Sequence, residues 1–414
     1  MRIWNHLAVA TFVALAMAGC IDEEPTTTTD DQPVEPQPEM NLTALPDTIT
    51  GFQYVGLGHE IGVSGLWLHD NKAYLSGSPG LRIIDISDPA NPVTLSNETG
   101  DVAGTRDVDI LEHPDGRTYA LLAHGGARIS LVDVSDPSFP VLVTTVENIG
   151  SAHNLAVVPN TTIVYNSISI NTNLGPAAGQ VGAVGKIDII DFADAENPVV
   201  KEFWFPAVVQ TPMGVPKVVA STTCHDITFH EGRQLGYCAG VTDTQIWDIS
   251  DPWNPVIIQV IDWPLVNIHH AVWATQDGNM LILGDEIAGV AAPVPGCGHD
   301  MPTSALWFID VTNIEVPTPV GYYQVSHSAV GASAEAGFPQ YCSTHFGTLI
   351  EDRPLLTMGH YTAGTSLVDF SDPANPREVD LYTAPGTNTW EARYYNGHVY
   401  TGDTGRGMEI LRIV

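Results

Sequence analysis

A short motif recurs through most of this chain and restricts what the chain can fold into. Its clearest copy is LRIIDISDPANP at Leu81–Pro92. Near-copies cover residues 129–140, 245–255 and 366–376, degenerate copies cover 187–198 and 306–319, and a truncated copy covers 407–414. Self-similarity at a regular spacing is typical of repeat architectures, in which each unit packs against its neighbours.

Each copy of the motif predicts two strands joined by a turn. The apolar run forms one strand, and the Asp–Pro step then starts a turn, because Asp accepts hydrogen bonds from the following backbone and Pro fixes φ. A second apolar run, such as residues 141–146, follows the last proline, and another hairpin lies upstream, as at residues 226–237. Four strands in a repeat of roughly 50 residues are typical of a β-propeller blade.

The seven copies therefore predict an all-β fold, a seven-bladed β-propeller of four-stranded antiparallel blades over residues 48–414. The last copy lacks an outer strand. We expect the segment GFQYVGL at residues 51–57 to supply that strand. This pairing would close the ring and remove an open sheet edge.

These repeats resemble the LVIVD-repeat family of bacterial and archaeal cell-surface β-propellers. The resemblance rests on the pattern apolar-apolar-Asp-apolar-Ser-Asp-Pro and covers about residues 51–414. It implies a propeller fold and a location at the cell surface, but it implies no particular reaction.

The composition excludes one class of partner. The chain has 15 Lys and Arg against 48 Asp and Glu, which gives a formal net charge of −33. A nucleic-acid partner is excluded, because neutralising phosphates requires clustered Lys and Arg. The 38 Gly and 30 Pro residues fit short strands joined by tight turns.

The first 47 residues predict export and a membrane anchor. Residues 1–19 read as a lipoprotein signal peptide, with Arg2, an apolar run over 7–17 and small residues before Cys20. An ordinary signal peptide with an incidental cysteine is the alternative. Residues 20–47 predict a lipidated Cys20 and a disordered acidic tether rich in Pro and Thr. We expect an exported, membrane-anchored lipoprotein at the outer membrane or cell surface, because Ile21 replaces the Asp of an inner-membrane retention signal.

Polar side chains recur at one equivalent position, at the start of the first strand of each blade. They are Ser64, Asp107, His153, His225, His270, His345 and Glu391. The first strand of a blade lines the central channel, so these side chains face a common axis. Imidazole nitrogens and carboxylate oxygens suit copper, zinc or iron. The predicted metal ligands are His153, His225, His270, His345, Glu391 and Asp107.

The second strands end at the same face of the propeller and add a second ring of candidates. These candidates are His124, Asp285, Glu286, His360 and Asp403. Two other interpretations of both rings stay open. The side chains can serve as hydrogen-bond partners inside the channel, since buried polar groups need such partners, or they can act in catalysis without a metal.

Two functions follow from this reading. The first is a surface-anchored binding or scaffold module whose channel face takes a protein, a glycan or a small molecule, with a transition-metal site at the channel mouth. The alternative is a metal-dependent oxidoreductase or hydrolase. In that alternative His225, His270 and His345 hold the metal, and Glu391 or Asp107 acts as a ligand or base.

Four cysteines besides Cys20 lie in the exported part of the chain, where an oxidising setting favours disulfides. Cys224 and Cys238 flank a predicted hairpin at equal distances from its turn, which predicts a disulfide between them. By elimination, Cys297 pairs with Cys342. Free thiols or a soft-metal site are the alternative.

Overall fold

The computed structural model describes residues 45–59, 62–98, 100–168, 183–286, 304–325, 342–350 and 353–414. The predicted signal peptide, Cys20 and most of the predicted tether lie outside these residues. Within the described part of the chain, no helix is long and apolar enough to cross a membrane.

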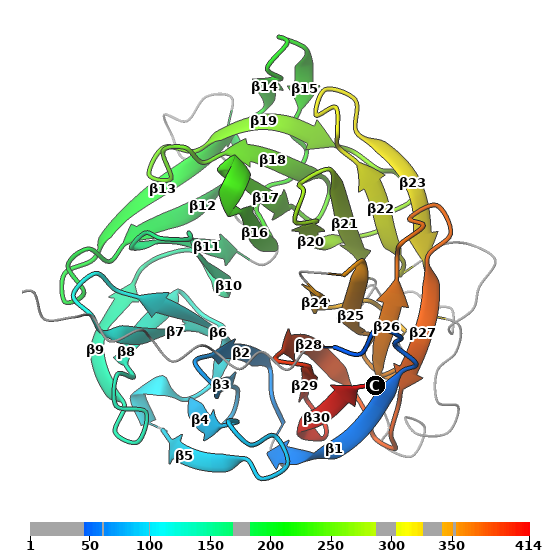
Figure 1. The fold of residues 1–414 in the computed structure, drawn as a ribbon. Coiled ribbons are helices and arrows are strands. Elements are labelled where there is room, and N and C mark those ends of the chain that lie inside the picture. The colour runs from blue at the N-terminus through cyan, green and yellow to red at the C-terminus, as the bar shows by residue number, and fades with distance from the viewer. Residues whose placement is uncertain are drawn as a thin grey trace, which may run out of the picture. The chain divides into compact units, whose positions relative to one another are not determined.

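Seven four-stranded antiparallel sheets are arranged as blades around a ring (Figure 1). Blade one contains β2 (Gly65–His69), β3 (Lys72–Ser76), β4 (Arg82–Asp85) and β5 (Val93–Asn97), and blade two contains β6 (Thr105–Glu112), β7 (Thr118–His124), β8 (Arg128–Asp133) and β9 (Val141–Glu147). Blade three contains β10 (Ala152–Val157), β11 (Ile163–Ile168), β12 (Ala183–Asp191) and β13 (Val199–Pro206), and blade four contains β16 (Asp226–His230), β17 (Leu235–Ala239), β18 (Thr244–Asp248) and β19 (Val256–Ile261).

The remaining blades repeat this order. Blade five contains β20 (His269–Ala274), β21 (Met280–Asp285), β22 (Leu306–Asp310) and β23 (Thr318–Tyr323), and blade six contains β24 (Gly347–Ile350), β25 (Leu355–Gly359), β26 (Thr365–Asp369) and β27 (Arg377–Tyr382). Blade seven contains β28 (Thr389–Tyr395), β29 (His398–Asp403), β30 (Gly407–Ile413) and β1 (Phe52–His59). The predicted all-β, seven-bladed propeller is confirmed. The first strand of each blade lies innermost, as Figure 1 shows.

The ring closes through the two ends of the described chain. Strand β1 pairs antiparallel with β30, in a register that places Phe52 opposite Ile413. The backbone N–H of Gly51 also donates a hydrogen bond to the carbonyl of Val414 at 3.1 Å. The predicted closing strand is therefore confirmed, and it runs two residues beyond Leu57, to His59.

The repeated Asp of the motif has the same structural role in blade after blade. Asp85 ends β4, and its Oδ1 accepts a hydrogen bond from the backbone N–H of Ser87 at 2.8 Å. The same hydrogen bond, from the backbone N–H of the second residue after the Asp, forms in five other blades. The accepting residues are Asp133, Asp191, Asp248, Asp310 and Asp369. This local bond satisfies a backbone donor where the third strand ends and the chain turns toward the outer strand.

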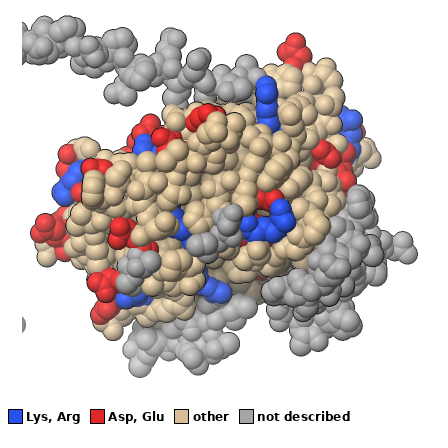
Figure 2. Space-filling view, turned by 90° about the horizontal axis from the view of Figure 1, so that it is seen from below, with Lys and Arg blue, Asp and Glu red and all other residues tan. Residues whose placement is uncertain are grey.

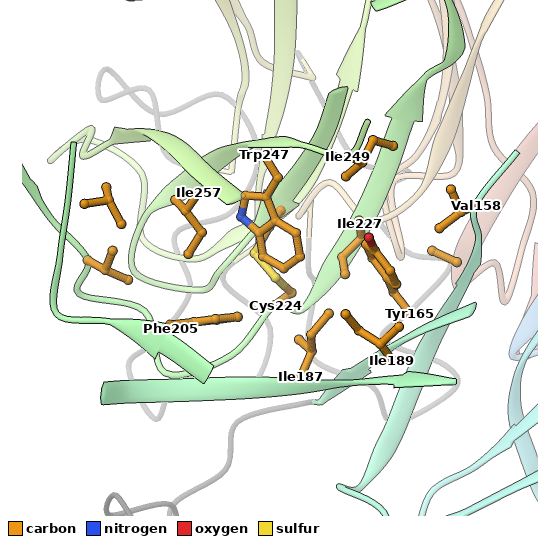
Figure 3. Close-up of a cluster of buried hydrophobic side chains, with 14 of the residues drawn as sticks. Val158, Tyr165, Ile187, Ile189, Phe205, Cys224, Ile227, Trp247, Ile249 and Ile257 are labelled. Atoms are coloured by element: carbon orange, nitrogen blue, oxygen red, sulfur yellow. A yellow bond between two sulfur atoms is a disulfide. The ribbon is translucent and has the colours of Figure 1, made fainter. Parts of the chain in front are cut away.

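The hydrophobic core lies between neighbouring blades. Between blades three and four, Trp247 is fully buried, and its ring centroid lies 5.2, 5.6 and 6.0 Å from those of Phe203, Phe205 and Tyr165. Figure 3 shows Trp247 with Phe205 and Tyr165 in this core. The surface, unlike this core, carries charged residues. Figure 2 shows acidic and basic side chains scattered over one side of the molecule among uncharged residues.

One short hairpin lies outside the blades and was not predicted. Strands β14 (Val208–Gln210) and β15 (Pro216–Val218), which follow blade three in sequence, form a two-stranded sheet that contacts β19, and Figure 1 shows it projecting from the rim. Two 3-10 turns, η1 (Gly100–Val102) and η2 (Glu231–Arg233), complete the described elements.

The predicted disulfide between Cys224 and Cys238 is confirmed. Their Cα atoms lie 5.4 Å apart, and both side chains are fully buried in the core between blades three and four. Cys342 is also disulfide-bonded, but its predicted partner Cys297 lies outside the described residues. Because Cys224 directly precedes His225, the Cys224–Cys238 bond anchors the start of an inner strand.

We expect the double variant Cys224→Ala/Cys238→Ala to lose about 3 kcal/mol of unfolding free energy, because the bond closes a loop of 14 residues in the unfolded chain. Urea unfolding of the oxidised proteins measures this difference. Both proteins unfolded and refolded in a thiol reductant are the control, and their midpoints should then match, because the reductant also opens the disulfide of Cys342 in each of them. Equal midpoints for oxidised wild type and variant would contradict the expectation.

Candidate metal centre

Four imidazoles form a continuous row in the central channel. Ring centroids lie 4.4 Å apart for His153 and His225, 4.1 Å for His225 and His270, and 4.5 Å for His270 and His345. The four residues lie at the starts of the inner strands of blades three to six. Repetition of the blade brings equivalent positions to the axis, so residues far apart in sequence become neighbours.

A carboxylate from a neighbouring loop joins this row. Glu286 directly follows β21, and its Oε2 lies 3.4 Å from Nε2 of His270. One donor atom each from His225, His270 and Glu286 lies within 4.8 Å of the other two, and all three residues are buried. Within the described residues, this group has the spacing and the donor types that a metal ion requires.

The imidazoles of this group lack the partners that buried polar atoms normally have. Nδ1 of His225 and both ring nitrogens of His270 are buried without a hydrogen-bond partner. Leaving such an atom unsatisfied costs about 1–3 kcal/mol. Burial lowers the pKa of His225 to about 4 and that of His270 well below its usual value. Both rings are thus neutral near pH 7, so the contact of His270 with Glu286 is not an ion pair and the ring lone pairs are available.

A backbone carbonyl orients the ring of His345 so that it could coordinate a metal ion. Its Nδ1 lies 2.9 Å from the carbonyl oxygen of Trp390, which can only accept a hydrogen bond. The proton therefore lies on Nδ1, and the lone pair lies on Nε2. This arrangement is the usual one for a metal-ligating histidine.

His153 has the opposite tautomer. Its Nδ1 lies 3.0 Å from Nη1 of Arg106. A guanidinium only donates hydrogen bonds, so Nδ1 of His153 accepts and the proton lies on Nε2. In this tautomer His153 offers the channel a hydrogen-bond donor and no free lone pair.

Glu286 is held in place by Tyr361, whose hydroxyl donates a hydrogen bond to Oε1. This leaves Oε2 facing His270. Sequence reasoning missed both Tyr361 and Arg106. Their positions in the sequence indicated only weakly that they reach the channel, since Tyr361 directly follows the candidate His360 and Arg106 directly precedes the candidate Asp107.

The other second-ring candidates are buried and make structural hydrogen bonds. His124 and His360 bond serine hydroxyls six residues further along the chain, at 2.9 and 2.8 Å. Asp285 and Asp403 accept bonds from backbone N–H groups of adjoining loops. Of this ring, only Glu286 belongs to the three-donor group among the described residues.

The remaining positions of the first ring belong to a different network. Oε2 of Glu391 pairs with Nε of Arg393 at 2.9 Å, and Oδ2 of Asp107 accepts a hydrogen bond from the backbone N–H of Leu155 at 2.8 Å. Ser64 donates a hydrogen bond to the carbonyl of Thr105 at 3.0 Å. The structure therefore places Asp107 and Glu391 around Arg393, outside the group of His225, His270 and Glu286.

Glu391 should make stability depend on pH. Burial raises its pKa to about 8, so the folded chain binds a proton that the unfolded chain loses near pH 4.5. Stability from this group is therefore present at low pH and is lost as the pH rises toward 8. We expect the unfolding free energy of Glu391→Gln, relative to wild type, to increase by about 1 kcal/mol per pH unit across this window.

Urea unfolding of both proteins at pH 5, 6.5 and 8 measures this change. Glu147→Gln, which removes an exposed strand carboxylate, is the control and should differ from wild type by a similar amount at each pH. A constant difference between Glu391→Gln and wild type would contradict the expectation.

Comparison with known proteins supports the fold. The family model described as LVIVD repeat matches residues 62–98 and 117–148. Among solved structures, the β-propeller domain of Cps50 (Swd1) from Myceliophteria thermophila is similar, with a TM-score of 0.56 and 10% identity over 86% of this chain and 98% of that one. No curated protein matches the chain. The matched repeats lie in blades one and two and do not include the row of imidazoles.

Proposed function

We propose that this chain, a β-propeller protein of the LVIVD-repeat type, is a binding module that holds a transition-metal ion in its channel through His225, His270 and Glu286. One observation carries the proposal. The three buried residues bring two neutral imidazoles and a carboxylate within 4.8 Å of one another, and ring nitrogens of both histidines lack a hydrogen-bond partner. A bound ion gives these nitrogens the partner that burial otherwise denies them.

The donor set restricts the metal and the kind of site. Imidazole and carboxylate donors suit zinc, copper or iron. His345, whose lone pair lies on Nε2 and whose ring lies 4.5 Å from that of His270, is the fourth candidate ligand. This assignment takes Glu286 from the predicted second ring and leaves out His153, Asp107 and Glu391 of the predicted metal ligands.

A metal-dependent hydrolase or oxidoreductase is the second candidate function. The observation that favours it is a donor group of three residues, because catalytic sites keep a coordination position open whereas structural sites fill all four with protein ligands. A metal bound there supplies Lewis acidity or redox chemistry. The chain itself supplies the Nε2–H of His153 as a hydrogen-bond donor beside His225.

Metal titration of chelator-treated protein tests the proposal. We expect one equivalent of Zn²⁺, Cu²⁺ or anaerobic Fe²⁺ to bind to the wild type, and Glu286→Gln to weaken the binding at least tenfold. Glu391→Gln is the matched control, because it also removes a buried channel carboxylate but should keep the metal. Absence of binding of all three metals would contradict the proposal, as would retention of the metal by Glu286→Gln and its loss from Glu391→Gln.

The location of the protein is a separate proposal that rests on residues 1–47. We propose that Cys20 is lipidated and that residues 21–47 tether the propeller to the outer membrane or cell surface. Mass spectrometry of the N-terminal peptide after expression in a bacterium should show a diacylglycerol on Cys20. Cys20→Ala should move the protein from the detergent phase to the aqueous phase. An unmodified Cys20 in a membrane-free protein would contradict this proposal.

A further inference from the structure

A cavity of about 1420 Å³ opens at the other end of the channel from the row of imidazoles. The histidines lie where the inner strands begin, whereas the cavity is lined by residues further along the same strands, such as Phe229 and Trp273. Phe346 separates the two regions. Its ring lies 4.8 Å from that of His270 and 4.6 Å from that of His345, and it also lines the cavity.

The inner wall of this cavity carries more negative than positive charge. Asp107, Asp109 and Asp226 line it and are all buried, while the guanidinium of Arg393, which also lines the cavity, lies 2.9 Å from Glu391. Asp107 and Asp109 accept hydrogen bonds at 2.8 Å from backbone N–H groups of β10. Burial raises the pKa of these carboxyls, to about 6 for Asp107 and to about 7 for Asp109 and Asp226, so their charged forms are disfavoured and a bound cation would stabilise them.

Asp226 points most directly to a ligand. Asp226 is only 8% exposed and lines the cavity, yet within the described part of the chain no other side chain lies within hydrogen-bond or ion-pair distance of its carboxylate, and Arg393 attracts it only from further away. Burial is the main cause of the raised pKa of Asp226; the charge of Arg393 opposes the rise and the charge of the neighbouring Asp107 adds to it. A buried carboxylate of this kind normally has a positively charged partner.

The remaining wall indicates the size and character of that partner. Trp67, Phe229, Trp273 and Phe346 line the cavity, and aromatic faces attract organic cations. Arg393 already lies over the ring of Trp67, 4.8 Å from its centroid. A space of this volume with apolar walls and a few charged groups is typical of an organic ligand and far exceeds what a bare metal ion fills.

We propose that this cavity binds an alkyl diammonium ion, with one ammonium group at Asp226 and Asp107 and the carbon chain against Trp273 and Phe346. The site is distinct from the proposed metal centre and does not depend on it. Asp226 and Asp107 supply the charge, and the aromatic wall supplies the apolar contact.

Calorimetric titration of the metal-free full chain with cadaverine tests the proposal. Pentanediol and glutarate have the same chain length but carry no charge or negative charge. We expect cadaverine to bind at least ten times more tightly than either. Asp226→Asn should weaken cadaverine binding at least tenfold, while Asp101→Asn, which removes an exposed carboxylate outside the cavity, should bind it like the wild type.

Asp107→Asn is the second variant if Asp226→Asn fails to fold, because the amide oxygen can still accept the bond from Leu155. It should also weaken cadaverine binding, and it should bind zinc like the wild type, which separates this site from the metal centre. The proposal is overturned if cadaverine does not bind, if pentanediol binds as tightly, or if both variants bind like the wild type. Ca²⁺ that displaces cadaverine while cadaverine alone binds weakly would also overturn it, because the ligand would then be a metal ion.

Discussion

His270→Ala should eliminate stoichiometric metal binding and leave the propeller folded. His270 lies in the middle of the row, with His225 on one side, His345 on the other and Glu286 3.4 Å away. Its removal leaves two donors of the three-donor group, so we expect affinity to fall at least about 100-fold, because changes in the outer shell alone already cost 10- to 100-fold. Equilibrium dialysis against zinc, with the metal content measured in the retained protein, gives the affinity.

Stability should change little in this variant when metal is absent. Both ring nitrogens of His270 lack hydrogen-bond partners, so alanine removes two unsatisfied polar atoms as well as packing contacts. His360→Ala is the matched control, because His360 is equally buried but bonds Ser366 at 2.8 Å. We expect that control to keep the metal and to lose about 1–3 kcal/mol of stability. A full equivalent of zinc bound to His270→Ala at wild-type affinity would contradict the assignment.

Trp247→Ala should cause the largest loss of stability, about 3–5 kcal/mol of unfolding free energy. The indole is fully buried between blades three and four, where it contacts three aromatic rings, and its Nε1 donates a hydrogen bond to Oε1 of Gln245 at 2.9 Å. Alanine would leave a cavity at an interface between blades and an unpaired amide oxygen. Urea unfolding followed by circular dichroism measures the difference from wild type.

Trp204→Ala is the control for this change. Trp204 lies on the outer strand β13, is only partly buried, and bonds the side chain of Glu202 at 3.1 Å. Its replacement should cost less than half as much as that of Trp247. Equal losses in the two variants would show that the core between blades three and four is not the dominant source of stability there.

The fold was predictable because its determinants are local and repeated. Each Asp of the motif accepts a hydrogen bond from a backbone donor two residues later, so one copy of the sequence specifies one turn. Repetition then supplies the strand order. The same repetition explains why an aligned position predicts spatial neighbours, as for His225 and His270, which are 45 residues apart but have ring centroids 4.1 Å apart.

The composition of the donor group was not predictable in the same way, because it depends on hydrogen-bond and ion-pair partners that the repeat does not specify. Asp107 and Glu391 occupy the aligned position, but Arg393 and the amide of Leu155 engage them. Asp285 and Glu286 are adjacent in sequence, yet one binds loop amides and the other faces His270. The alignment identifies which residues reach the channel. It does not show which rotamer or hydrogen bond each side chain adopts there.

X-ray absorption spectroscopy at the metal edge of the zinc-loaded protein tests the central claim most directly. The proposed centre predicts a first shell of nitrogen and oxygen only, with the multiple scattering of two or three imidazoles and one carboxylate. His270→Ala should remove that signal from the retained protein. A first shell that contains sulfur, or one of water oxygens without imidazole scattering, would contradict a metal site formed by His225, His270 and Glu286.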